Sequence, residues 1–338
     1  MIVDNLFDTI KRGMLGYNKG LSTGLPKLDK LTYGIQQGWM TLVGADTGAG
    51  KSSLVLYTTI YNVYKSYIKD PSIPIKFLIF SFEMSAEALL AKMLSMHIYD
   101  TYKKVLPYSD ILSFNKTLSE EDFQMVEESK TWLTGFTEIA TIVDKPVTAS
   151  GLYGICKEWC KTLGTITQVS EHKEEFTPFN DKQIPIVVLD HIGLMDISAG
   201  KTKKDEMDIA AKHLIYFRNK YKFCVYLIQQ LNRNFKQMDR RKSEHAFIQL
   251  DDFEQSSGPT HAAEIVIGIY HPYREKNWNP LGYDVRQLKD RSRILICLKN
   301  RYGQADKALG VVFYGETGIW KELPQPDQIN DYSIYLNP

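Results

Sequence analysis

Apolar residues gather along this chain in short runs, each of which ends in a polar or charged residue. Five runs share the format: "WMTLVG", "IKFLIFSFE", "IPIVVLDH", "FCVYLIQQ" and "SRILICLKNR", at 39–44, 75–83, 184–191, 223–230 and 292–301. Runs this rich in Val, Ile and Leu, without clean alternation, are typical of strands buried on both faces of a parallel sheet. Helix-like stretches occur between them, at 51–68, 85–99, 119–133, 148–162 and 205–221. The pattern predicts an α/β fold with a mostly parallel sheet flanked by helices and right-handed crossovers.

The remaining segments add smaller features. "IVIGIY" at 265–270 predicts a further strand, and "ALGVVFYGETGIW" at 308–320 predicts two strands around a Gly-rich turn, an antiparallel C-terminal edge. The polar stretch 168–183 is interpreted as a surface insertion. Residues 1–19 predict a short amphipathic linker helix with no separate domain before the core at 20–325, and 326–338 is assigned as a tail.

Polar residues end the buried runs. Ligands of parallel α/β sheets bind at the carboxyl ends of the strands. The five runs place these residues there: Gly44, Glu83, Asp190, Gln230 and Lys299. We therefore expect all five positions at one edge of the sheet.

Composition narrows the class of protein. The chain has 338 residues with 43% apolar content, and 41 Lys plus Arg balance 40 Asp plus Glu, so any basic surface must be local. The four cysteines form no C-x-x-C pair, which favours buried thiols in a reduced compartment, and Cys156 and Cys160 share a helix face that is expected to pack inward. No apolar run reaches the roughly 18 residues of a membrane span, and acidic residues near the start do not fit a signal peptide. A cytoplasmic protein without a membrane partner is expected.

A candidate phosphate-binding loop, "GADTGAGKSS", follows the first buried run at 44–53. Gly48 and Gly50 free the backbone to wrap phosphates, Lys51 can reach the terminal phosphates, and Ser52 can hold magnesium where the next helix begins. Ala45 stands where a strict motif has glycine, which is tolerable if its backbone angles are ordinary. The predicted nucleotide-binding positions are Ala45, Asp46, Thr47, Gly48, Ala49, Gly50, Lys51, Ser52 and Ser53. The alternative is a Gly-rich turn without a ligand.

Three strand-end residues would complete such a site. Asp190 after "IVVL" could bind magnesium through water, and Glu83 could orient and deprotonate the attacking water. Gln230 could sense the γ-phosphate through an amide hydrogen bond. The alternatives are a helix N-terminal acid for Glu83 and a polar strand end for Gln230.

Basic residues are concentrated in the segment that follows Gln230. "NRNFKQMDRRK" at 232–242 combines cations with one aromatic residue, a composition that suits a nucleic-acid backbone, although solvated charge is the commoner meaning of such a run. The candidate DNA contacts here are Arg233, Asn234, Lys236, Arg240, Arg241 and Lys242. A second loop with Ser, Gly and Pro lies at 250–264.

Two further cations, Lys299 and Arg301, are two residues apart in "CLKNRYG". On an extended chain they point the same way, so they could reach phosphates of their own or of a neighbouring subunit. A surface pair is the alternative.

The order of these motifs resembles the RecA-like ATPase domain of DnaB-type replicative helicases. The stretches "LDHIGLM" and "GETGIW" also resemble the helicase half of phage primase-helicases and their mitochondrial relatives. The resemblance rests on "GLSTGLPKLDKLTYGI", "GADTGAGKSS", "FSFEMS", "VVLDHIGLM", "QQLNR", "LKNRYG" and "GETGIW". It implies a RecA-like P-loop core that uses ATP and Mg²⁺, and a homohexameric ring that moves on single-stranded DNA and unwinds duplex DNA, with a primase or helicase loader as possible partners.

By motif position, the resemblance assigns residue roles. Lys51 and Ser52 would bind phosphate and magnesium, Glu83 would be the catalytic carboxylate, Asp190 the Walker B acid and Gln230 the sensor. Lys299 and Arg301 would enter the neighbour's ATP site, with Arg301 as arginine finger. DNA-contacting loops would include Gln255 and Ser257, although Glu254 replaces a basic residue common in the family. The competing hypotheses are a RecA-like or KaiC-like ATPase that does not unwind DNA and a non-hydrolysing adaptor.

Overall fold

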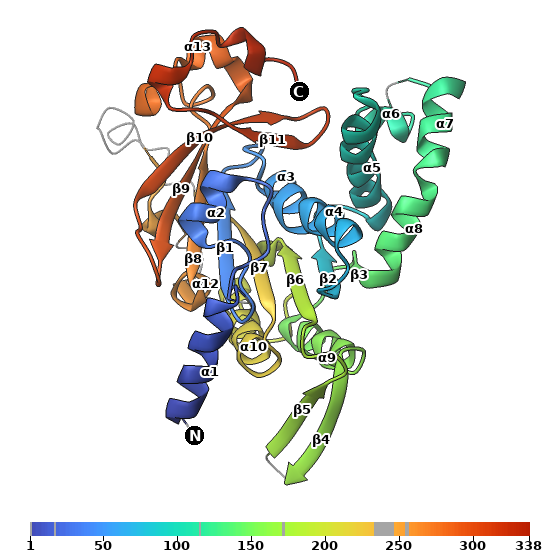
Figure 1. Ribbon diagram of the computed structural model, residues 1–338, viewed down its shortest axis with the longest axis vertical. Helices are drawn as coiled ribbons and strands as arrows, with labels where there is room; N and C mark the ends of the chain where they lie inside the picture. Colours follow the sequence, from blue (N-terminus) through green and yellow to red (C-terminus); the bar gives the residue numbers. More distant parts are fainter. Residues whose placement is uncertain (1, 17, 115, 171–172, 233–246, 254–256) are drawn as a thin grey trace.

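A nine-stranded sheet forms the centre of the computed structural model, which describes residues 2–16, 18–114, 116–170, 173–232, 247–253 and 257–338. The strand order is β11-β10-β9-β8-β1-β7-β6-β2-β3 (Figure 1). The strands are β1 Met40–Ala45, β2 Ile75–Ser81, β3 Ala140–Val143, β6 Ile184–Asp190, β7 Cys224–Gln230, β8 Ile265–Tyr270, β9 Ser292–Asn300, β10 Lys307–Tyr314 and β11 Ile319–Glu322. The strands β8, β1, β7, β6, β2 and β3 are parallel to their neighbours in that order. The pairs β8–β9, β9–β10 and β10–β11 are antiparallel. The predicted α/β fold with an antiparallel C-terminal edge is confirmed.

Helices cover the sheet in groups. They are α1 Ile2–Met14, α2 Pro26–Thr32, α3 Lys51–Val55, α4 Asn62–Lys69, α5 Ala86–Tyr102, α6 Tyr108–Ile111, α7 Glu120–Glu128, α8 Lys130–Ile139, α9 Ala149–Cys160, α10 Lys203–Tyr221, α12 Ser257–Ala262 and α13 Val285–Leu288. A π-helical turn at Leu56–Tyr61 joins α3 to α4, so 51–69 is one helical run. In Figure 1, α5 to α8 form a group beside β2 and β3, and α9, α10 and α12 form another.

Local sequence explains where several helices begin. Ser85 and Thr148 accept hydrogen bonds from backbone N–H groups in the first turns of α5 and α9. Thr202 and Asp205 form a reciprocal capping box at the start of α10. Such side chains satisfy N–H groups that have no partner inside the helix. All five predicted helical stretches are present, although the stretch at 119–133 divides at Ser129 into α7 and α8.

Three features differ from the sequence-based expectation. The run 292–301 forms a strand, but β9 is antiparallel to β8. The segment 140–143 was not predicted and adds β3 at the edge of the sheet. The polar insertion is a two-stranded hairpin, β4 Gly164–Ser170 and β5 Lys173–Pro178, which projects from the lower end in Figure 1. Strand direction was missed because a strand buried on both faces has the same apolar pattern in either direction.

The cysteines are buried, as the sequence predicts. All four cysteines are free and buried, and burial raises the pKa of Cys160 to about 12. The inward packing expected for Cys156 and Cys160 is confirmed. Among the described helices, none is both long enough and apolar enough to cross a membrane.

Candidate functional site

The carboxyl ends of five neighbouring strands meet at one edge of the sheet. Ala45, the last residue of β1, is in register with Gln230 of β7 on one side and with Ile269 of β8 on the other. Further along the edge, Ser81 of β2 is in register with Asp190 of β6. The structure therefore brings together the candidate loop, Gln230, Asp190 and the segment that carries Glu83.

The loop after β1 has the backbone geometry that phosphate binding requires. Gly48 and Gly50 have φ values of 74° and 105°, in the left-handed region that favours glycine. A Cβ on Gly50 would also lie 2.8 Å from the ring of Trp320. Ala45, by contrast, is paired on both sides as the end of a strand, so its extended backbone does not need glycine. Because α3 begins at Lys51, the N–H groups of its first turn face the concavity of the loop.

Lys51, Ser52, Glu83 and Asp190 form a compact cluster. The Ser52 hydroxyl donates to Glu83 Oε2 at 3.4 Å, and Lys51 Nζ lies 3.9 Å from the same oxygen. Lys51 is buried, whereas the Glu83 side chain is 43% exposed. A half-exposed carboxylate beside a hydroxyl and an ammonium can meet both water and a phosphate.

Asp190 has properties that suit a cation ligand. Burial raises the pKa of its carboxyl to about 6, and the Glu83 charge adds to the rise, while a hydrogen bond with Ser52 opposes it. Asp190 Oδ1 is buried without a hydrogen-bond partner among the described residues. A buried carboxylate oxygen without a partner is costly unless a ligand satisfies it. The donor set of Ser52 and Asp190 is hard oxygen, which Mg²⁺ prefers.

Gln230 and His191 complete this part of the edge. The Gln230 amide donates to Thr47 Oγ1 at 2.7 Å, so the predicted sensor is bonded to the loop itself. His191 Nδ1 accepts from the Gly193 backbone at 3.2 Å, and burial lowers its pKa to about 4. His191 is therefore a neutral, locally satisfied side chain.

The expectation that Lys299 shares this edge is wrong. Because β9 is antiparallel, Asn300 at its end is in register with Ile265, the first residue of β8. Lys299 and Arg301 therefore lie at the amino edge of the parallel strands. There Lys299 Nζ donates to the Thr260 carbonyl at 2.9 Å, and Arg301 donates to the His261 carbonyl at 2.6 Å.

Two arginines that sequence reasoning missed contact the loop instead. Arg293 of β9 is buried and its Nε donates to the Ala49 carbonyl at 2.8 Å. Arg274, in the connection after β8, donates to the Thr47 carbonyl at 2.5 Å. The signal available for Arg274 was the run "IVIGIY", which ends at the same edge and is followed by "HPYR".

A cavity of about 550 Å³ adjoins the loop. Gly48, Arg291, Arg293, Phe313 and Glu316 are among the residues that line it. Phe313 stacks on Trp320 with ring centroids 4.5 Å apart. A volume in this range, with an aromatic ring and cations, suits a planar ring attached to phosphates.

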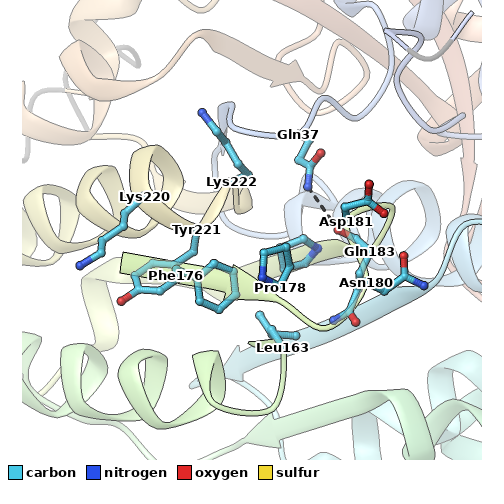
Figure 2. Close-up of a pocket in the computed structure, with 11 residues that line it drawn as sticks. Gln37, Leu163, Phe176, Pro178, Asn180, Asp181, Gln183, Lys220, Tyr221 and Lys222 are labelled. Carbon is cyan, nitrogen blue, oxygen red and sulfur yellow. Dashed lines mark hydrogen bonds between the residues drawn. The ribbon is translucent and has the colours of Figure 1, made fainter. Parts of the chain in front are cut away.

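A second cavity of about 430 Å³ lies at the base of the β4–β5 hairpin (Figure 2). Figure 2 shows Phe176 beside Tyr221, with Pro178 and Leu163 nearby. The Gln37 amide donates to the Gln183 carbonyl at 3.2 Å. None of the predicted site residues that the structure describes lines this cavity.

Most candidate DNA contacts lie outside the described residues: Arg233, Asn234, Lys236, Arg240, Arg241, Lys242 and Gln255. Ser257 begins α12, and its side chain is also outside the described part. Hydrogen bonds connect the end of β7, where the basic segment begins, to the second loop at 250–264. The Gln229 amide donates to the Phe253 carbonyl at 2.6 Å, and the Asn232 N–H donates to the Asp252 carbonyl at 2.8 Å. A Cβ on Gly44 would overlap the Phe253 ring, so the second loop packs directly against β1.

Comparisons with known proteins agree with this geometry. The family model described as DnaB-like helicase C terminal domain matches residues 20–150. Replicative DNA helicase DnaB of Mycoplasma pneumoniae is 23% identical over 311 residues, 90% of this chain and 57% of that protein. The protein of the same name from Helicobacter pylori is 23% identical over 272 residues, 80% of this chain and 47% of that protein. The chain thus spans about half the length of these relatives.

Solved structures show the same fold. One of them, described as an ATPase domain, has a TM-score of 0.71 at 16% identity, covering 95% of this chain and 99% of that one. A DnaB-like replicative helicase, described together with its interactions with primase, has a TM-score of 0.68 at 16% identity, covering 95% and 66%. Motifs, family model, relatives and fold together make the chain similar to the C-terminal domain of DnaB-like replicative helicases.

Proposed function

We propose that this chain is the ATP-hydrolysing motor of a ring-shaped replicative DNA helicase. The observation that carries the proposal is the cluster of Lys51, Ser52, Glu83 and Asp190 beside a loop with phosphate-binding geometry. An adaptor without hydrolysis has no use for a complete set of these groups.

The residues divide the chemistry of hydrolysis among them. Loop N–H groups and Lys51 would bind the phosphates, while Ser52 and Asp190 would hold Mg²⁺, which when bound neutralises charge on the phosphates. Glu83, close to Ser52 and half exposed, orients a water molecule and accepts its proton. Gln230 exchanges its hydrogen bond to Thr47 for one to the γ-phosphate. This change of partner would alter the position of the segment that follows Gln230. The aromatic and cationic cavity beside Gly48 holds the nucleoside.

The second half of each active site would come from another copy. Lys299 and Arg301 lie at the edge opposite the loop, too far along the fold to act on it. When complementary groups lie on opposite sides of one chain, head-to-tail association satisfies both and closes into a ring if the rotation allows. The resemblance to DnaB-type proteins sets six as the expected number of subunits, with Arg301 as the arginine finger of each interface.

The N-terminal helix offers a further contact between subunits. One face of α1 is apolar and exposed to solvent. Its side chains are each at least 47% exposed: Val3, Leu6, Phe7 and Ile10. A contiguous apolar patch of this kind often marks a surface that binds another protein. We propose that α1 is the linker helix and docks on an adjacent subunit. Removing residues 2–16 should lower the mass of the assembly, and an unchanged mass would contradict the docking.

Single-stranded DNA is the proposed substrate along which the assembly moves. The basic run that starts at Arg233 and the Gly- and Ser-containing loop that includes Gln255 and Ser257 would contact its phosphates. A primase or a loader is a further candidate partner, because one structural neighbour is described with primase interactions. Binding to DNA phosphates should weaken steeply as salt rises.

The test combines mass and activity. Native mass should correspond to six subunits with an ATP analogue and single-stranded DNA. ATP hydrolysis should rise on adding single-stranded DNA, and a forked duplex should separate only with ATP. Stimulated hydrolysis without strand separation would favour a RecA-like or KaiC-like ATPase, and absence of hydrolysis would favour the adaptor.

A further inference from the structure

The parallel strand on the far side of β1 from Gln230 supplies a cation that no motif assigns. β7 and β8 flank β1 in the sheet. Gln230 ends β7, and Arg274 follows the end of β8. Arg274 therefore lies at the carboxyl edge, where the sequence pattern had predicted Lys299.

Arg274 and Gln230 converge on one residue of the loop. Arg274 donates to the Thr47 carbonyl at 2.5 Å, and the Gln230 amide donates to the Thr47 hydroxyl at 2.7 Å. The two side chains thus approach the loop from its two neighbouring strands. A residue with the same placement as the proposed γ-phosphate sensor is positioned to meet the same phosphate.

The loop leaves room for the guanidinium. A Cβ on Gly48 would lie 3.0 Å and 3.1 Å from the two terminal nitrogens of Arg274. A real Cβ would rarely come that close, so glycine at this position serves both the left-handed backbone and the approach of Arg274. The close approach therefore depends on the loop sequence itself.

The contact that holds Arg274 is weaker than the one a nucleotide would offer. The Thr47 carbonyl is a neutral acceptor, whereas a phosphate oxygen is charged, and a guanidinium bonds charged planar or tetrahedral oxyanions more strongly. The side chain is exposed, so a change of rotamer meets little packing resistance. Arg274 can leave the carbonyl once a phosphate is within reach.

We propose that Arg274 is a cis phosphate ligand, which binds the terminal phosphate of the nucleotide held by its own subunit. In this structure it donates to the Thr47 carbonyl, and on ATP binding it would turn to the γ-phosphate. The inference rests on the proposed function, and it adds a cation from the same subunit to the one that Arg301 supplies from the neighbour.

Nucleotide affinity tests the assignment without relying on turnover. In the full chain, Arg274→Ala should weaken binding of a fluorescent non-hydrolysable ATP analogue about 10- to 100-fold, because a charge-assisted bond to the γ-phosphate is lost. Affinity for the matching ADP analogue should change by less than about 3-fold, since ADP lacks that phosphate. Arg274→Lys should recover part of the ATP affinity. Lys276→Ala, a charge-matched change two residues away, should leave both affinities unaltered.

Three outcomes would contradict a proposal, two of them the role of Arg274 and one the proposed function. Equal losses for ATP and ADP analogues, with Arg274→Lys as weak as Arg274→Ala, would mean that Arg274 only supports the loop. No change in either affinity would also overturn the proposal. A wild-type chain that binds both nucleotides but never hydrolyses ATP would contradict the proposed function and leave this affinity comparison intact.

Mixed assemblies separate cis from trans action. In well-mixed rings of Arg274→Ala and Lys51→Ala subunits, with exchange verified by mass, a cis residue predicts no recovery of hydrolysis, because every site lacks one of the two groups. Recovery would show that Arg274 acts on the neighbour's site and would overturn the cis assignment.

Discussion

The two edges of the parallel sheet hold their polar and charged groups in different ways. At the carboxyl edge, Glu83 is half exposed, Asp190 has an oxygen without a partner among the described residues, and Gln230 is bonded to a hydroxyl of the loop. At the amino edge, Glu264 is 3% exposed and fully engaged, with Arg218 at 2.8 Å and the Met40 N–H at 2.8 Å. Groups with unused bonding capacity indicate a place where a ligand binds, whereas satisfied groups indicate a scaffold.

Arg301 belongs to both categories, which makes it informative. It lies 3.4 Å from Glu264 and donates to the His261 carbonyl, so the scaffold orients it, yet its side chain is 45% exposed. An exposed cation on a rigid strand end can be presented to another subunit at little entropic cost. The contrast between the edges therefore predicts which substitutions affect catalysis and which affect folding.

The largest effect is expected for Arg301, the proposed arginine finger. Arg301→Ala should lower kcat for ATP hydrolysis about 1000-fold, the usual loss for such a residue. Mixing Arg301→Ala with Glu83→Gln subunits should restore some hydrolysis, since certain interfaces then hold both groups. Lys307→Ala, an exposed cation at the start of β10, should behave like wild type. No recovery in well-mixed rings would count against action in trans.

Stability of the amino edge depends on Glu264. Glu264→Gln should lower the free energy of unfolding by roughly 3 kcal/mol, because it leaves the buried Arg218 without its counter-charge. Chemical denaturation measures the change. Glu158→Gln, which removes an exposed pair with Lys161, should cost less than about 1 kcal/mol. A Glu264 variant as stable as the Glu158 variant would show that the amino edge is no scaffold.

At the carboxyl edge, Glu83, the proposed catalytic carboxylate, should matter for turnover and hardly for folding. Glu83→Gln should reduce kcat about 100-fold or more while nucleotide binding and the unfolding midpoint persist, since the side chain is half exposed. Steady-state hydrolysis and a binding titration separate the two quantities. Glu87→Gln, on the first turn of α5, is the matched control. Unimpaired turnover would assign the proton transfer to another group.

Much of the fold and of the site could be predicted from the sequence, for identifiable reasons. Asp190, Gln230 and the loop were placed correctly because parallel strands bring their carboxyl ends to one edge whatever lies between them. Lys299 was misplaced because nothing in "SRILICL" reports strand direction. Arg274 was missed because its role depends on a contact with Thr47, 227 positions away along the chain. The short-range pattern, "IVIGIY" followed by "HPYR", indicates the edge of the sheet where Arg274 lies but not its contact with Thr47.

The smallest effect is expected at Thr47, whose hydroxyl accepts a hydrogen bond from Gln230, the proposed sensor. Thr47→Val keeps the side-chain shape but removes the hydroxyl that accepts from Gln230. Binding an ATP analogue no longer has to break that hydrogen bond, so its affinity should rise about 5-fold, equivalent to roughly 1 kcal/mol. Thr47→Ser keeps an acceptor and should match wild type. A loss of affinity in Thr47→Val would instead mean that the hydroxyl contacts the nucleotide directly, and Gln230 would then be held by the scaffold, as groups at the amino edge are.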